Sequence, residues 1–151
     1  MERLVSLAAA LAVAIGSNES GALGDTSSPE SRPRIVVVKP VILCDDDGSN
    51  PARHALPKTL VDRVYTNAGL EFVYLEPIRW PYGKGRRGEI NLNQIVREGL
   101  KTRIISRDRR VVTLLFVTAV DGHSGPLGRG MQNGNICFVS LGPDGKMTDP
   151  A

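Results

Sequence analysis

The chain has 151 residues, of which 41% are hydrophobic, and its 19 lysines and arginines against 16 aspartates and glutamates give a formal net charge of +3. This length suits one domain with a single core, because domains most often contain about 100–150 residues. The excess positive charge is small and aromatic residues make up only 5% of the chain. The arginines therefore lack the aromatic neighbours of a nucleic-acid surface, and we expect no binding to nucleic acid.

The N-terminus has the pattern of a secretory signal peptide. Arg3 gives it one positive charge, an apolar run follows over 4–15, and Gly16 supplies a small residue for cleavage. The run is shorter than the roughly 20 residues of a membrane-spanning helix. We therefore predict a signal peptide over 1–16, a disordered linker over 17–33, and a secreted or periplasmic protein that is not bound to a membrane once the leader is removed. A buried N-terminal helix is the alternative interpretation of the apolar run.

From residue 34 onward the hydrophobic pattern alternates between that of strands and that of helices. Pro40 has no N–H for a ladder, so the first strand either begins at Val41 or has an edge or a bulge at Pro40. Pro57 and Gly69 suit the first position and the C-terminal cap of the first helix. In chain order the predicted elements are a strand over 34–44, a helix over 57–68, a strand over 70–76, a helix over 91–101 and strands over 111–120 and 136–141.

This order of elements predicts an α/β fold, with a twisted, mostly parallel sheet of about four strands and two helices. The uncharged strand over 111–120 is expected to be buried on both faces. The strand over 136–141 is expected nearer an edge. Between them, a glycine-rich loop over 121–135 permits tight bends and lets another chain approach the backbone closely.

An acidic turn over 45–49 follows the first predicted strand, and open α/β sheets place their sites at such strand ends. The turn resembles the first motif of haloacid-dehalogenase-type phosphatases. That resemblance implies that Asp45 and Asp47 act as nucleophile and acid–base group with Mg²⁺, with Thr118 as a downstream hydroxyl. A calcium loop is disfavoured because Leu56 stands where an EF-hand needs glutamate. The alternative is a turn whose aspartates bond nearby backbone N–H groups.

Two cysteines and two histidines are the remaining candidates for a metal or redox site. A disulfide between Cys44 and Cys137 suits an exported protein, and two buried thiols are the alternative. The spacing of these cysteines with His54 and His123 resembles no zinc site, so we expect both histidines to be surface side chains. Ser124 is not in the setting of a nucleophile elbow, and the glycine-rich loop lacks the pattern of a phosphate-binding loop.

The order of elements resembles the amino-terminal half of a metzincin-type zinc metallopeptidase of the matrixin-like kind. The segments that carry this resemblance lie over 40–45, 64–70, 72–77, 116–117 and 128–139. The resemblance implies a twisted sheet whose edge strand lines a cleft and pairs with an extended peptide substrate. With the edge assigned to the strand over 136–141, the predicted peptide-binding residues are Gly134, Asn135, Ile136 and Phe138.

The resemblance also implies a helix with a His-Glu-x-x-His motif, which holds zinc and supplies the general base. This motif occurs nowhere in the sequence. The resemblance therefore assigns no catalytic residue and no metal ligand to this chain, and we expect no cofactor and no peptidase activity. We expect 34–151 to be a truncated metzincin-like subdomain, an exported remnant of a zinc metalloendopeptidase, with one face of its sheet left exposed. The alternatives are a small secreted module that pairs an edge strand with a peptide, and the phosphatase described above.

Overall fold

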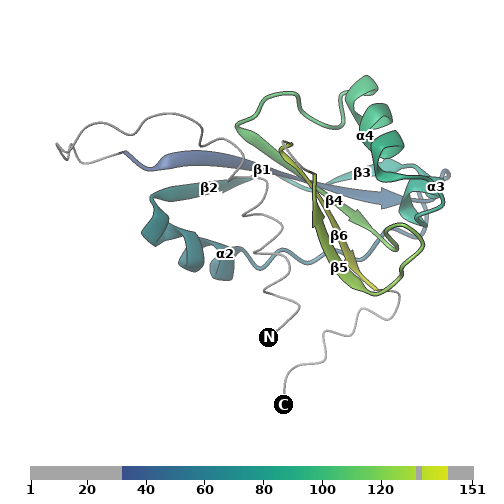
Figure 1. Ribbon diagram of the computed structural model, residues 1–151, viewed down its shortest axis with the longest axis horizontal. Coiled ribbons are helices and arrows are strands. Elements are labelled where there is room, and N and C mark those ends of the chain that lie inside the picture. Colours follow the sequence, from purple (N-terminus) through teal and green to yellow (C-terminus); the bar gives the residue numbers. More distant parts are fainter. Residues whose placement is uncertain (1–31, 132–133, 143–151) are drawn as a thin grey trace, which may run out of the picture.

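The structure, a computed structural model, describes residues 32–131 and 134–142. Within these residues, six strands, three α-helices and one short 3₁₀ helix form an α/β fold (Figure 1). The elements are β1 (Arg34–Cys44), α2 (Lys58–Tyr65), η1 (Thr66–Ala68), β2 (Leu70–Tyr74), β3 (Ile78–Pro81), α3 (Gly83–Arg86), α4 (Leu92–Lys101), β4 (Val111–Val117), β5 (Pro126–Gly130) and β6 (Ile136–Leu141). The predicted signal peptide and the predicted linker up to residue 31 lie outside the described residues.

The six strands form one mixed sheet, in which five strands follow the order β2-β1-β4-β6-β5. The sixth strand, β3, pairs with the last part of β1, whereas β2 pairs with its first part. Strands β2, β3 and β4 are parallel to β1, and β6 is parallel to β4, whereas β5 is antiparallel to β6. The predicted α/β class is confirmed. The predicted sheet of about four strands with two helices is too small, because β3, β5 and α3 are short and rich in glycine, proline or basic residues, which give weak sequence signals.

Pro40 lies inside β1, at a bulge in the ladder. The register of β1 against the neighbouring chain shifts there by one residue, from Val38 opposite Tyr74 to Val41 opposite Ile78. Backbone groups of alternate residues point to the same side of a strand, and the Val38 carbonyl accepts a 2.9 Å hydrogen bond from the Leu75 N–H on the β2 side. The backbone nitrogen of Pro40, which carries no hydrogen, therefore faces the gap between β2 and β3. Of the alternatives for Pro40, a strand that begins at Val41 is wrong, because β1 begins at Arg34, and the extra residue at the register shift lies in the segment 75–77 opposite Pro40.

Helix α2 covers one face of the sheet and ends as its sequence predicts. Pro57 is its N-cap residue, and Gly69 ends the following 3₁₀ turn with a left-handed φ of 70°. Val61 is buried against the sheet, and the Tyr65 ring meets Phe72 of β2 edge-on, with 5.6 Å between ring centroids. The residues of this α2-side cluster are Val36, Val38, Ile42, Ala52, Val61, Phe72, Val112, Leu114, Phe116, Cys137 and Val139.

Helix α4 covers the opposite face (Figure 1). The Asn91 side chain caps it by accepting a 2.9 Å hydrogen bond from the Gln94 N–H. Gly99 of α4 packs closely against Ile105, because a Cβ at this position would lie 2.5 Å from Cδ1 of Ile105. The residues of this α4-side cluster are Val41, Leu43, Trp80, Leu92, Ile95, Ile105, Leu115, Val117, Val120, Ile136 and Phe138.

The expected exposed sheet face is not found in the described β4–β6 region. Phe116 and Val139, on the α2 side, are 1% and 3% exposed, and Phe138, on the α4 side, is fully buried. The segment before α2 contributes to this cover, since Ala52 belongs to the α2-side cluster. A large hydrophobic side chain is exposed instead at the start of β1, where Ile35 is 54% exposed.

Candidate functional site

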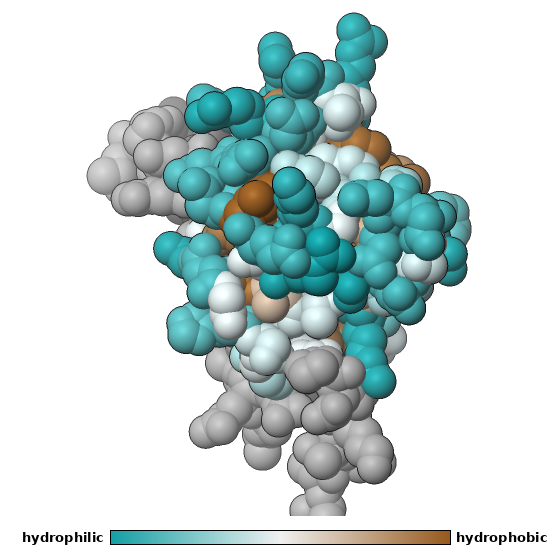
Figure 2. Space-filling model, turned by 90° about the vertical axis from the view of Figure 1, so that its right-hand side faces the viewer, coloured by the Kyte–Doolittle hydropathy of each residue, from teal (hydrophilic) through white to brown (hydrophobic). Residues whose placement is uncertain are grey.

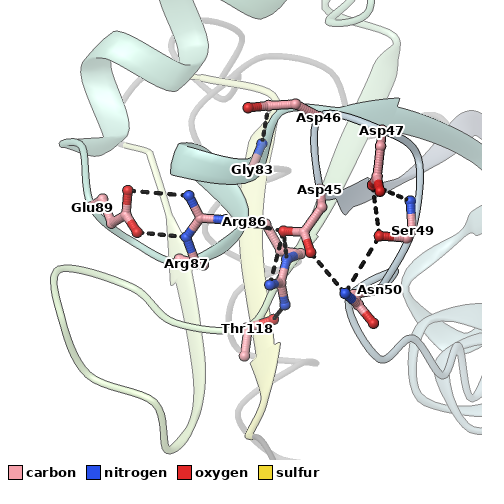
Figure 3. Close-up of polar contacts among 10 residues, drawn as sticks. All are labelled: Asp45, Asp46, Asp47, Ser49, Asn50, Gly83, Arg86, Arg87, Glu89 and Thr118. Atoms are coloured by element: carbon pink, nitrogen blue, oxygen red, sulfur yellow. Dashed lines mark hydrogen bonds and ion pairs between the residues drawn. The ribbon is translucent and has the colours of Figure 1, made fainter.

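The acidic turn lies at the carboxyl end of β1, and its aspartates bond different parts of the protein (Figure 3). The Asp46 carboxylate accepts a 2.8 Å hydrogen bond from the N–H of Gly83, the first residue of α3. The Asp47 carboxylate accepts hydrogen bonds from the N–H and the hydroxyl of Ser49, at 2.9 and 2.6 Å. These bonds lower the pKa of Asp47, with the Ser49 hydroxyl contributing most. Asp47 therefore has the local role that the alternative interpretation of this turn predicted.

Asp45 is bound by two arginines and one amide. Its Oδ1 accepts hydrogen bonds of 3.0 Å from Nε of Arg86 and from Nη1 of Arg87, and its Oδ2 accepts one of 2.9 Å from the Asn50 side chain. The pKa of Asp45 lies below its ordinary value, mainly because of the Asn50 hydrogen bond and then because of Arg86. The carboxylate is therefore held in its charged form, with both oxygens engaged.

Arg86 also joins this turn to the end of β4. Its Nη1 donates a 3.1 Å hydrogen bond to the Thr118 hydroxyl, and its backbone carbonyl accepts a 2.8 Å hydrogen bond from the Thr118 N–H. The Ser140 hydroxyl of β6 donates to the Thr118 carbonyl at 2.9 Å. The Arg86 guanidinium thus links α3 to the carboxyl ends of β1 and β4. The Ser140 hydroxyl links β6 to the same residue at the end of β4, Thr118.

The predicted phosphatase residues are thus only partly brought together. The structure places Thr118 near Asp45, but the Arg86 guanidinium stands between them, and Asp47 is turned toward Ser49. Figure 3 shows the Asp45 and Asp47 side chains engaged with separate partners. The end of the molecule where β1 and α3 lie faces the viewer in Figure 2 and is mostly hydrophilic, with small hydrophobic patches. This arrangement suits a structural link between the ends of the strands better than it suits a Mg²⁺ site.

The remaining metal-ligating residues do not gather into a site. Among residues 32–131 and 134–142, no three His, Cys, Asp or Glu side chains lie close enough to hold a metal ion. His54 is exposed and its ring meets Phe116, with 6.2 Å between ring centroids. His123 is exposed in a tight turn that pairs it with Val120. Both histidines are surface side chains, as expected, and the described residues do not fit the zinc site that the metzincin resemblance implies.

Of the two alternatives for Cys44 and Cys137, the structure has the second, because both cysteines are buried thiols and no disulfide joins them. Leu114 of β4 pairs with Pro40 on one side and with Cys137 on the other, so Cys44 is four residues along and two strands across from Cys137. With usual strand dimensions the two Cα atoms are about 16 Å apart, against a limit of about 7 Å for a disulfide. Burial raises the pKa of the Cys137 thiol to about 12, which disfavours the reactive thiolate.

The four predicted peptide-binding residues do not lie on an edge strand. β6 pairs with β4 on one side and with β5 on the other, so Ile136 and Phe138 are buried inside the sheet, at 6% and 0% exposure. The Asn135 side chain donates hydrogen bonds to the carbonyls of Asp108, at 2.9 Å, and Val111, which fastens the start of β4. The half-buried Gly134 lies in the turn that precedes Asn135. The edge assignment is wrong because the glycine-rich loop itself forms the outermost strand, β5.

β5 is exposed along much of its length. Pro126, Leu127 and Arg129 are exposed, and Gly128 and Gly130 are half-buried. Arg129 forms an ion pair with Asp121, which lies in the turn that precedes β5. Among the described residues no strand pairs with the outer edge of β5. This edge is therefore one of the two ends of the described sheet, with β2 at the other, where a further strand can be added.

The register shows which backbone groups of β5 point outward. The Met131 N–H donates a 3.0 Å hydrogen bond to the Ile136 carbonyl, so the backbone groups of this opposed pair face each other across the ladder. In an antiparallel ladder such pairs alternate with pairs whose N–H and C=O groups point away from each other. Gly130 and Gly128, opposite Cys137 and Val139, belong to the second kind. Their N–H and C=O groups therefore point to the open side of the sheet.

Sequence reasoning missed Gly128 and Gly130 as candidate functional residues, although the segment was recognised as one that another chain could approach. The alternation of glycine with Leu127 and Arg129 is the signal that could have marked a strand with one bare face. Glycine and proline are depleted in strands, so the composition of the segment favoured a loop instead.

Comparisons of this chain with protein-family models, with curated proteins and with solved structures give no match. Within the described residues no helix is long and apolar enough to cross a membrane.

Proposed function

We propose that this protein binds extended polypeptide segments by adding them as a strand to the outer edge of β5. The observation that supports this most directly is the pair of outward-pointing N–H and C=O groups at Gly128 and Gly130, on a strand that is outermost among those described. A peptide strand laid on such an edge gains main-chain hydrogen bonds with few demands on its sequence. Pro126 limits the site at one end, because it offers a carbonyl but no N–H.

The metzincin resemblance supports the same function, since it implies an edge strand that pairs with an extended peptide substrate. Under this proposal the chain corresponds to the peptide-holding half of such an enzyme. We infer binding without peptide cleavage for the sequence as it stands, because it contains no His-Glu-x-x-His motif. The described residues include no group that could hold zinc, so we assign them no hydrolytic step.

Export from the cell belongs to the proposal and is supported by the pattern over 1–16. Expression of the full chain in a secreting host, followed by mass spectrometry of the product, tests it. A mature protein that begins at Ser17 is expected. A product that retains residues 1–16 contradicts export.

A panel of blocked Lys-Thr-X-Thr-X-Thr peptides, with X as Gly, Ala, Leu, Phe or Trp, tests peptide binding to the full chain by fluorescence anisotropy. Gly130→Pro removes one outward N–H, and Gly130→Ala is the matched control that keeps it. We expect at least one peptide to bind the wild type and the Ala variant, and to lose at least tenfold in affinity with the Pro variant. Absence of binding by every peptide, or equal binding by the two variants, contradicts the proposal.

A further inference from the structure

The two faces of β5 offer different surfaces to an added strand. Residues opposite one another in a ladder share a face. Gly128 and Gly130 are opposite Val139 and Cys137, which belong to the α2-side cluster. Arg129 is opposite Phe138, of the α4-side cluster. β5 therefore carries side chains toward the α4 side at Leu127 and Arg129, whereas on the α2 side two successive positions have none.

These bare positions are also the ones that bond outward. A strand added antiparallel to β5 places two of its residues directly opposite Gly128 and Gly130, where each exchanges both backbone hydrogen bonds with its glycine. The side chains of these two residues then lie on the α2 side, over the glycine backbone. The residue between them lies opposite Arg129 and projects to the α4 side, where Arg129 is already engaged with Asp121.

We propose that this edge selects extended peptides with large, preferably aromatic, side chains at two positions separated by one residue. The inference rests on the proposed function and specifies its ligand class. A flat ring fits across a glycine, because there is no Cβ to hold it away, and cross-strand aromatic rings compensate edge glycines in this way. Methyl-sized side chains at the same two positions leave the glycine backbone in contact with water and gain little from the pairing.

A second copy of this chain fits the edge less well than a peptide does. If two β5 strands pair with Gly128 opposite Gly130, the two copies of Arg129 lie directly opposite each other. Cα atoms of such a pair are about 4.5 Å apart, and like charges directly opposite are unfavourable. β5 also has no large side chain on the α2 side to place over the glycines of its partner. The occupant that suits this edge is therefore a peptide with large alternate side chains.

The peptide panel described above tests this preference with the full chain. We expect the Phe and Trp peptides to bind about two- to fivefold more tightly per X position than the Ala peptide. Gly128→Leu fills one of the two bare positions and is expected to reduce the preference for Phe over Ala to the roughly two- to fivefold contribution of the position at Gly130. Arg129→Leu is the matched control, since it places the same side chain on the other face and should keep the preference. Gly130→Leu provides a second test if thermal unfolding shows that Gly128→Leu does not fold.

Three results would overturn the inference and can be distinguished. Equal affinity for all X, together with loss of binding in Gly130→Pro, removes the preference and leaves the proposed function standing. No binding by any peptide removes both. A dimer in sedimentation that Gly130→Pro dissociates assigns the edge to a second copy of the chain.

Discussion

The acidic turn after β1 and the outer edge of β5 differ in where their polar groups are directed. The turn has the side chains that chemistry uses, but Asp45, Asp46 and Asp47 are each bonded within the protein. The edge of β5 has no such side chains, yet the backbone groups of Gly128 and Gly130 point outward. Under the proposed function, the strand that lacks side chains on one face marks the site, whereas the dense group of charged residues has a structural role.

The largest expected effect is on peptide binding at the edge. Gly130→Pro should lower peptide affinity at least tenfold and change the melting temperature by no more than a few degrees, since edge strands tolerate proline where the N–H points outward. Anisotropy and thermal unfolding on the same sample measure the two effects. A large loss of stability would show that the Gly130 N–H is bonded within the protein.

The opposite result is expected at the acidic turn. Arg86→Leu keeps the packing of the side-chain stem and removes the hydrogen bonds to Asp45 and to the Thr118 hydroxyl. We expect the free energy of unfolding to fall by about 2 kcal/mol, because each of the two hydrogen bonds contributes about 1 kcal/mol, and we expect peptide affinity to stay within twofold. Chemical denaturation gives the first value. A loss of peptide affinity comparable to that of Gly130→Pro would show that the two regions act together.

A smaller effect is expected from pH. The folded-state pKa of Asp45 is lowered, so its contribution to stability is present above its unfolded pKa of about 3.9 and is lost as the pH falls through the folded value. The difference in melting temperature between wild type and Asp45→Asn should therefore shrink from pH 7 to pH 3. Aspartates elsewhere are unchanged in the variant and serve as an internal control. A difference that is constant with pH would contradict the ion pairing of Asp45.

The smallest expected effect is on phosphatase activity. Because Arg86 and Arg87 engage the Asp45 carboxylate, wild type and Asp45→Asn should hydrolyse p-nitrophenyl phosphate with Mg²⁺ at the same background rate. Asp47→Asn is a second variant for the same assay. Activity in the wild type that Asp45→Asn abolishes would restore the phosphatase hypothesis and remove the contrast between the two regions.

Local signals predicted much of the fold. The helix predicted over 57–68 corresponds to α2 and η1, because Pro57 and Gly69 define its ends through their own backbone preferences. The helix predicted over 91–101 corresponds to α4 and its cap at Asn91. The apolar runs that form β1, β4 and β6 were recognised from their composition. Each of these signals depends on residues that lie close together in the sequence.

The site could not be predicted in the same way. The partner of Asp45 is Arg86, 41 residues away in the sequence, and no spacing rule connects the two. β5 is a strand because β6 pairs with it, since its own composition favours a loop. The edge was assigned to β6 while the segment that forms β5 was interpreted as part of a loop, and the composition of one strand carries no information on its position within a sheet.

The sequence by itself determined the segments that form α2, α4, β1, β2, β4 and β6, and that they combine into an α/β fold. Only the tertiary structure decided that β5 and not β6 is outermost, that Asp45 binds two arginines, and that Gly128 and Gly130 turn their backbone groups outward. The physical reason is that local conformation follows from neighbours along the chain, whereas strand order and hydrogen-bond direction follow from pairing between distant segments.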